Sequence, residues 1–97
     1  MKEYYVYIVQ CRDNSFYTGI TSNLTGRLAE HNQGQFPKCY TFSRRPVKLV
    51  FHQIFTDPLD AIRSEKQIKG WSRAKKQALI DGDWEELRSL SKSRQNR

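Results

Sequence analysis

Three stretches of the chain carry the residue pattern of β-strands. Residues 4–11 are a run of β-branched and aromatic side chains, and residues 16–20 are a second such run after the turn-forming sequence at 12–15. These two runs predict an antiparallel hairpin. Residues 47–55 predict a third strand. Because both faces of the first run are apolar or aromatic, we expect that strand to be covered on both sides.

Helical patterns account for most of the remaining chain. Each predicted helix begins at a capping residue, and the first three end near a glycine. The helices run from a cap at Thr21, Ser22 or Asn23 to Gly34, from Asp57 to Gly70, from Ser72 to Gly82, and from Asp83 through Leu90. Residues 35–46 have no period and are predicted to form a basic loop. The pattern therefore predicts one α/β domain over residues 1–90, with a frayed polar tail over residues 91–97.

The net charge of the chain bears on its binding partner. With 97 residues the chain has room for one domain, and its formal net charge is +7. Such an excess indicates affinity for a polyanion, and nucleic acid is the commonest polyanion in a cell. The alternative at this point is a charge excess that only aids solubility. No apolar run is long enough to span a membrane, so we expect no membrane partner.

The two cysteines bear on the compartment. Cys11 and Cys39 have no CxxC spacing and no second pair, which favours free thiols in a reducing compartment over a disulfide. The first residues lead directly into a strand pattern and do not resemble a signal peptide. The expected location is the cytoplasm.

Several polar residues fall where the periodicity calls for apolar ones. Glu65 lies on the apolar stripe of its helix, four residues after Ala61 and three before Ile68. A carboxylate there must be paired, metal-bound or at the margin of the core. Arg27 and His31 are four residues apart and project from one side of the first helix. An arginine there can bind a phosphate group, and a histidine can donate or accept a proton near neutral pH. The alternatives are a rim glutamate paired with a lysine or arginine, and an ordinary exposed basic face.

The hairpin adds two tyrosines and a glycine. Tyr7 and Tyr17 lie on the two strands, where cross-strand packing alone would account for them. Their phenols gain chemical interest if nearby cations or a metal lower the pKa. Gly19 weakens its strand and marks a place where a ligand or another backbone approaches closely.

Taken in order, these residues resemble the GIY-YIG nuclease domain, in particular its small stand-alone bacterial branch. Residues 6–8 stand in the place of "GIY" and residues 17–19 in the place of "YIG". The segments 24–34, 44–47 and 68–73 are also similar, so the resemblance covers roughly residues 4–88. It implies a three-stranded antiparallel sheet flanked by helices, an α+β arrangement that agrees with the three strands above.

The resemblance also implies roles for the five candidate site residues. Tyr7 matches the tyrosine that activates the attacking water, and Tyr17 the one that positions the nucleophile or phosphate. Arg27 matches the arginine that binds phosphate, and His31 a polar residue that supports the same network. Glu65 matches the single carboxylate that holds one divalent cation, Mg²⁺ or Mn²⁺.

Two positions depart from the family pattern. Val6 stands where the motif name has glycine. Many members carry an asparagine in the region after the third helix, whereas residues 80–84 of this chain contain none; Asp81 or Asp83 could substitute, or the support could be absent.

We therefore expect a metal-dependent endonuclease that hydrolyses nucleic acid, with DNA favoured over RNA and a role in repair or recombination. A protein partner that supplies specificity is also compatible with so small a chain. The alternatives are a non-catalytic nucleic-acid-binding module on the same fold, and an interaction subunit that recruits a nuclease. The residues expected to contact the phosphate backbone are Arg44, Arg45, Lys69, Arg73, Lys75 and Lys76.

Overall fold

The first predicted strand forms the middle of the sheet. The computed structural model describes residues 2–95, and it contains a sheet of three strands in the order β2-β1-β3. Strand β1 spans Tyr4–Gln10, β2 spans Phe16–Thr21 and β3 spans Lys48–Phe55. Both pairings are antiparallel, so the expected sheet is confirmed.

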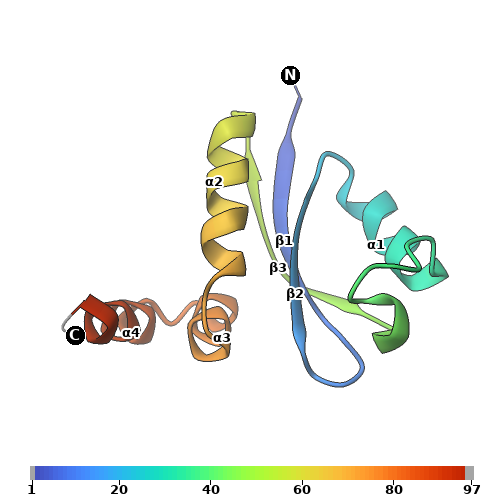
Figure 1. Cartoon of the computed structure of the whole chain (residues 1–97). Helices are drawn as coiled ribbons and strands as arrows, with labels where there is room; N and C mark the ends of the chain where they lie inside the picture. The colour runs from blue at the N-terminus through green and yellow to red at the C-terminus, as the bar shows by residue number, and fades with distance from the viewer. Residues whose placement is uncertain (1, 96–97) are drawn as a thin grey trace.

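Alternate side chains of β1 enter two separate cores. Val6 and Ile8 are fully buried on one face of the sheet, where α2 (Pro58–Lys69) and α3 (Arg73–Asp81) cover them. Tyr7 and Val9 are buried on the other face with α1 (Leu24–Gln33). Figure 1 shows this arrangement, with α2 and α1 on opposite sides of the strands. The prediction that β1 is covered on both sides is confirmed.

The helix ends follow the capping chemistry of the sequence. Among the three candidate caps of α1, Asn23 makes the bond: its side chain accepts a hydrogen bond from the amide of Gly26. Asp57 and Ser72 cap α2 and α3 in the same way. Gly34, with φ of 74°, ends α1 in the left-handed conformation that glycine adopts without strain.

The last helix, α4 (Trp84–Gln95), extends away from the sheet (Figure 1). Asp83 accepts a hydrogen bond from the amide of Glu86, as the capping spacing predicts. The helix continues to Gln95, so it overlaps the expected polar tail, and residues 96–97 of that tail lie outside the described residues. The boundary between domain and tail stays a prediction.

The expected loop between α1 and β3 contains one short 3₁₀ turn, Phe42–Arg44. Its end is tied to α1, because Asn32 both donates to the carbonyl of Val47 (3.0 Å) and accepts from its amide (2.7 Å). Both cysteines are free thiols. Within residues 2–95, none of the helices is long and apolar enough to cross a membrane.

Candidate active site

Tyr7 projects from the centre of the sheet toward α1, and the strand register explains why a glycine lies beside it. Tyr7 is directly opposite Gly19 in the β1–β2 pairing. A Cβ atom added to Gly19 would lie 2.5 Å from Cζ of Tyr7, so no other residue leaves room for the ring. The group that approaches Gly19 closely is this ring, a side chain and not the ligand or backbone that we expected, and it is 1% exposed.

The hydroxyl of Tyr7 meets a histidine from α1. Oη of Tyr7 and Nε2 of His31 are 2.8 Å apart, and both side chains are buried. The rings of Tyr7 and Tyr17 both lie edge-on to that imidazole, with centroid separations of 6.0 and 5.5 Å. The structure thus brings the two tyrosines and the histidine into one cluster.

Arg27 lies one helical turn before His31 and is partly exposed. Its Nε donates to Glu30 at 3.2 Å, and its guanidinium lies 5.3 Å from the centre of the Phe36 ring. Arg27 lies four residues before His31 on α1, so both project from the same side of the helix, and the charge of Arg27 acts to lower the pKa of Tyr7 and of His31. Arg27 therefore offers a cation at the open margin of the cluster.

Glu65 reaches the site from the other face of the sheet. It lies on α2, which packs against β2, and its negative charge adds a smaller contribution to the rise that burial and Cys39 cause in the pKa of Tyr17. Its side chain is 13% exposed and forms an ion pair with Lys69 at 3.3 Å, as the rim alternative predicts. The ammonium of Lys69 also lies 5.6 Å from the centre of the Tyr17 ring. Glu65 and Lys69 therefore approach Tyr17 from α2, whereas Tyr7, Arg27 and His31 lie on the side of the sheet that α1 covers.

Two further residues, neither of them among the expected site residues, continue the network behind His31. Nδ1 of His31 is 2.9 Å from Oγ1 of Thr41, and that hydroxyl donates to Sγ of Cys39 at 3.4 Å. Thr41 is 1% exposed. Burial acts to raise the pKa of Cys39, but hydrogen bonds from Thr41 and the neighbouring Tyr17 outweigh it and leave that pKa lowered. A buried threonine in a loop without a period leaves no signal in a single sequence.

Burial sets the protonation states of the central pair. Burial raises the pKa of Tyr7 above its ordinary value of 10.0, and the charge of Arg27 acts against that rise. Burial also raises the pKa of Tyr17, with further contributions from Cys39, Tyr7 and Glu65. The pKa of His31 is lowered from 6.5, because burial and then Arg27 disfavour the imidazolium. Near neutral pH the pair is a neutral phenol beside a neutral imidazole.

The expected phosphate-binding residues fall on both sides of this cluster. Arg44 donates to the carbonyl of Tyr40, and Arg45 donates to that of Phe42, so both are partly occupied in holding the loop. Arg73 donates to the carbonyl of Asn14 at 2.6 Å and is otherwise exposed.

Lysines of α2 and α3 make up the rest of the set. Lys69 is 55% exposed. Burial and then the charge of Lys69 lower the pKa of Lys76, which indicates two ammonium groups close together. Lys75 is 6% exposed and lies 4.6 Å from the centre of the Trp71 ring, so its position does not support a contact with phosphate.

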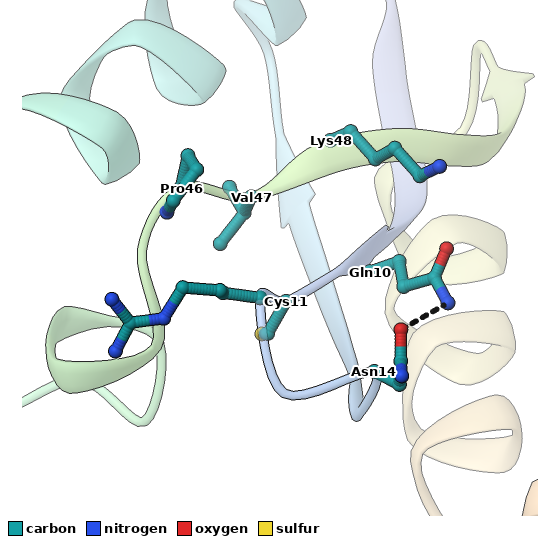
Figure 2. Close-up of a pocket in the computed structure, with 7 residues that line it drawn as sticks. Gln10, Cys11, Asn14, Pro46, Val47 and Lys48 are labelled. Carbon is teal, nitrogen blue, oxygen red and sulfur yellow. Dashed lines mark hydrogen bonds between the residues drawn. The ribbon is translucent and has the colours of Figure 1, made fainter.

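The described pockets lie elsewhere. Figure 2 shows one of about 270 Å³ at the end of β1, lined by residues that include Cys11, Val47 and Lys48, with Gln10 donating to Asn14. Another, of about 520 Å³, lies between β3, α2 and α4. None of the five site residues lines either pocket. The candidate site is instead a cluster of side chains between the sheet and α1, in which Tyr7 and His31 are buried and Arg27 is partly exposed.

The two departures from the family pattern have simple structural counterparts. Val6 is buried on the α2 face, opposite to the face that carries Tyr7, so its side chain belongs to the core. Asp81 accepts from Gln77, and Asp83 caps α4. Both acidic side chains thus make their hydrogen bonds within the helical layer.

The donor set limits the metals that this site could hold. Among the described residues, no group of three or more His, Cys, Asp or Glu side chains could hold a metal ion. Among the five candidate residues Glu65 supplies one carboxylate, a hard oxygen donor. One such ligand fits a cation that keeps most of its waters, such as Mg²⁺.

Comparisons with known proteins identify a family model and relatives that match most of the chain. The family model described as "GIY-YIG catalytic domain" matches residues 3–78. A UPF0213 protein of Staphylococcus haemolyticus is 48% identical over 81 residues, which cover 84% of this chain and 98% of that protein. A UPF0213 protein of Syntrophus aciditrophicus is 48% identical over 80 residues, which cover 82% and 92%.

Two solution NMR structures have a similar fold. The UPF0213 protein BH0048 from Bacillus halodurans is 37% identical with a TM-score of 0.55, and the match covers 92% of this chain and 97% of that one. The protein EF2693 from E. faecalis is 32% identical with a TM-score of 0.60, and the match covers 84% and 86%.

Proposed function

This chain belongs to the GIY-YIG catalytic domain family, and from that membership we propose that it is a metal-dependent endonuclease that hydrolyses phosphodiester bonds in nucleic acid. The observation that carries the proposal is the hydrogen bond between Tyr7 and His31, at the side of a partly exposed Arg27. A buried phenol hydrogen-bonded to an imidazole, beside a guanidinium whose ion pair with Glu30 is partly exposed, is an arrangement for moving a proton beside an anion.

Each site residue has a separate role in the proposed hydrolysis. A water molecule attacks phosphorus in line with the bond to the leaving oxygen. Its proton passes to Oη of Tyr7 while the phenolic proton passes to Nε2 of His31. Arg27 binds a phosphate oxygen and stabilises the charge of the transition state, and Tyr17 orients the phosphate. The P–O bond to the leaving group then breaks, and solvent protonates the leaving oxygen.

Glu65 is the residue that would hold the divalent cation, Mg²⁺ or Mn²⁺. When bound, the cation supplies positive charge at the phosphate oxygens. The carboxylate is available for this because its present partner, Lys69, is half exposed and can turn to a phosphate. A single protein ligand also implies that the substrate completes the coordination shell.

The basic residues around the cluster suit a polyanionic substrate. Arg27 is partly exposed beside the buried pair, and Lys69, which lies over the Tyr17 ring, is 55% exposed. We infer that the substrate is nucleic acid, DNA in preference to RNA, and that cleavage serves repair or recombination. A protein partner could supply specificity. The free thiols of the chain support a cytoplasmic location.

The ion pair between Glu65 and Lys69 favours one rival, a nucleic-acid-binding module that does not cleave. Structured DNA and RNA substrates, incubated with Mg²⁺ and with Mn²⁺, separate the two. The Arg27→Ala variant should lose cleavage by about a hundredfold or more, because the transition state loses its cation, while binding weakens only modestly. Arg63→Ala, on the outward side of α2 and 76% exposed, is the matched control. Cleavage that survives Arg27→Ala, or a wild type that matches a mock preparation, would leave the module as the better description.

A further inference from the structure

The loop between α1 and β3 delivers one buried hydroxyl to the back of the catalytic histidine. Thr41 lies 2.9 Å from Nδ1 of His31, on the side of the ring opposite to Tyr7. Three hydrogen bonds fix the loop around it. Arg45 donates to the carbonyl of Phe42, and Asn32 bonds to both the amide and the carbonyl of Val47. The hydroxyl is thus fixed in place and is not a mobile surface group.

The direction of the hydrogen bonds follows from counting protons. A threonine hydroxyl carries one proton and accepts through its lone pairs. Here that proton points to Sγ of Cys39, so the hydroxyl is left to accept from His31. A neutral imidazole that carries its proton on Nδ1 has a bare Nε2, and that nitrogen is the one 2.8 Å from Tyr7.

We propose that Thr41 is a positioning residue, which holds His31 in the Nδ1–H tautomer so that Nε2 can accept the phenolic proton of Tyr7. The proposal rests on the nuclease function proposed above. In the opposite tautomer Nε2–H would donate to Tyr7, and the phenol would have no base to receive its proton. Cys39 acts through Thr41, as the acceptor that sets the direction of the hydroxyl.

The proposal can be tested without any assay of activity. Two-bond ¹H–¹⁵N correlation spectra of the imidazole, recorded above the pKa of His31, identify which nitrogen carries the proton. The wild type should show His31 as the Nδ1–H tautomer. In Thr41→Val, which keeps the shape but removes the acceptor, a substantial Nε2–H population should appear. Thr41→Ser keeps the hydroxyl and should retain the wild-type pattern.

Cleavage provides the second readout. Thr41→Val should lower kcat by about ten- to a hundredfold with KM little changed, as is usual when a partner that orients a reactive group is removed. Thr41→Ser should restore most of the loss. Thr18→Val is the matched control: Thr18 is also 1% exposed, but it lies on the α2 face and its hydroxyl has no hydrogen-bond partner among the described residues.

The outcomes separate the two proposals. A wild-type His31 in the Nε2–H form overturns the inference about Thr41, whether or not the protein cleaves. A tautomer that shifts in Thr41→Val with kcat unchanged also overturns it, since the hydroxyl would then have no catalytic consequence. If the wild type cuts no substrate, the proposed function fails, while the spectra of wild type and variants still decide whether Thr41 sets the tautomer.

Discussion

At the scale of single residues, Glu65 is held in place by an interaction that is easy to exchange. Its partner Lys69 is 55% exposed, whereas Glu65 itself is 13% exposed. The lysine end of the pair is open to solvent, and helix pairs with this i, i+4 spacing stabilise the fold by only about 0.3–0.5 kcal/mol. The carboxylate can therefore change partners at little cost when a cation and a phosphate arrive.

Glu65→Gln should eliminate metal-dependent cleavage, because the amide keeps the shape of the side chain but loses its charge. The melting temperature should change by no more than about 3 °C, as expected for the loss of one i, i+4 pair whose lysine is half exposed. Cleavage and thermal unfolding are measured on the same preparation. Asp60→Asn, which removes an exposed carboxylate that pairs with Arg63 on the same helix, is the control and should cleave normally. Retained cleavage in Glu65→Gln, with a lowered melting temperature, would show that Glu65 is a structural residue.

His31 makes both stability and rate depend on pH. Its pKa is lowered in the folded protein, so the unfolded chain takes up a proton first as the pH falls. The stability due to neutral His31 is complete above about pH 6.5 and is lost as the pH falls through the folded pKa. The rate should fall in the same acid range, because an imidazolium cannot accept the proton of Tyr7.

Melting temperatures between pH 7.5 and 5, recorded for wild type and His31→Gln, test this dependence. The difference between the two proteins should shrink as the pH falls, while His52→Gln, at an exposed position on β3, should follow the wild type. Asp13 also has a lowered pKa, but its effect belongs to the range below 3.8. A difference that is constant with pH would mean that His31 does not titrate in this way.

At the scale of the elements, the hairpin register determines which groups can meet. Antiparallel partners share a face, so Val9 opposite Tyr17 and Tyr7 opposite Gly19 place both tyrosines toward α1. The alternation of β1 then sends Val6 to the other core. The spacing between the two family triplets therefore determines which residues of β1 and β2 are paired.

Gly19→Ala should damage the site through β1. The added Cβ would collide with the end of the Tyr7 ring, which cannot retreat because it is buried and bonded to His31. We expect a loss of about 1–3 kcal/mol of stability and of most cleavage.

Gly70→Ala is the matched control for that substitution. Gly70 has φ of –84°, and an added Cβ would meet nothing nearer than 3.6 Å. The change should be neutral or stabilising by up to about 1 kcal/mol. Circular dichroism melts and cleavage of both variants give the answer, and equal behaviour of the two would mean that Tyr7 can move.

The elements were predictable from the sequence because their signals are local. The runs of β-branched and aromatic residues, the caps at Asp57 and Ser72, and the stops at Gly34 and Gly82 all act within a few residues. The pairing of Tyr7 with His31 could be expected only through the family resemblance. The place of Thr41 could not be predicted, because contacts between the loop, α1 and β3 fix it.

At the scale of the whole molecule, cations flank Tyr17 on two sides. Arg44 lies 3.8 Å from the centre of the Tyr40 ring, and that ring is stacked on Tyr17 with 12° between the planes. Lys69 lies over Tyr17 from α2. The basic loop and the basic helices therefore meet at the site, although they are far apart in the sequence.

Binding of nucleic acid should weaken steeply as salt rises, with each neutralised phosphate adding about 0.7–0.9 to the slope of log K against log salt. Lys69→Gln should lower that slope by about one such step. Arg63→Gln, on the outward side of α2, should leave it unchanged. Titrations by fluorescence anisotropy at several salt concentrations measure the slopes. A flat dependence in the wild type would exclude phosphate contacts as the basis of binding.

The central place of β1 also determines the order in which the protein can be completed during synthesis. Its pairing with β2 is local, whereas its pairing with β3 joins residues as distant as Tyr4 and Phe55. Distant pairs form late, because a longer loop must close first. As the chain leaves the ribosome, Tyr7 and His31 are available before β3 and α2 exist, and one edge of β1 stays open until β3 arrives. Glu65, the carboxylate proposed to hold the metal, is synthesised after Tyr7, His31 and β3, so cleavage can begin only after the sheet has closed.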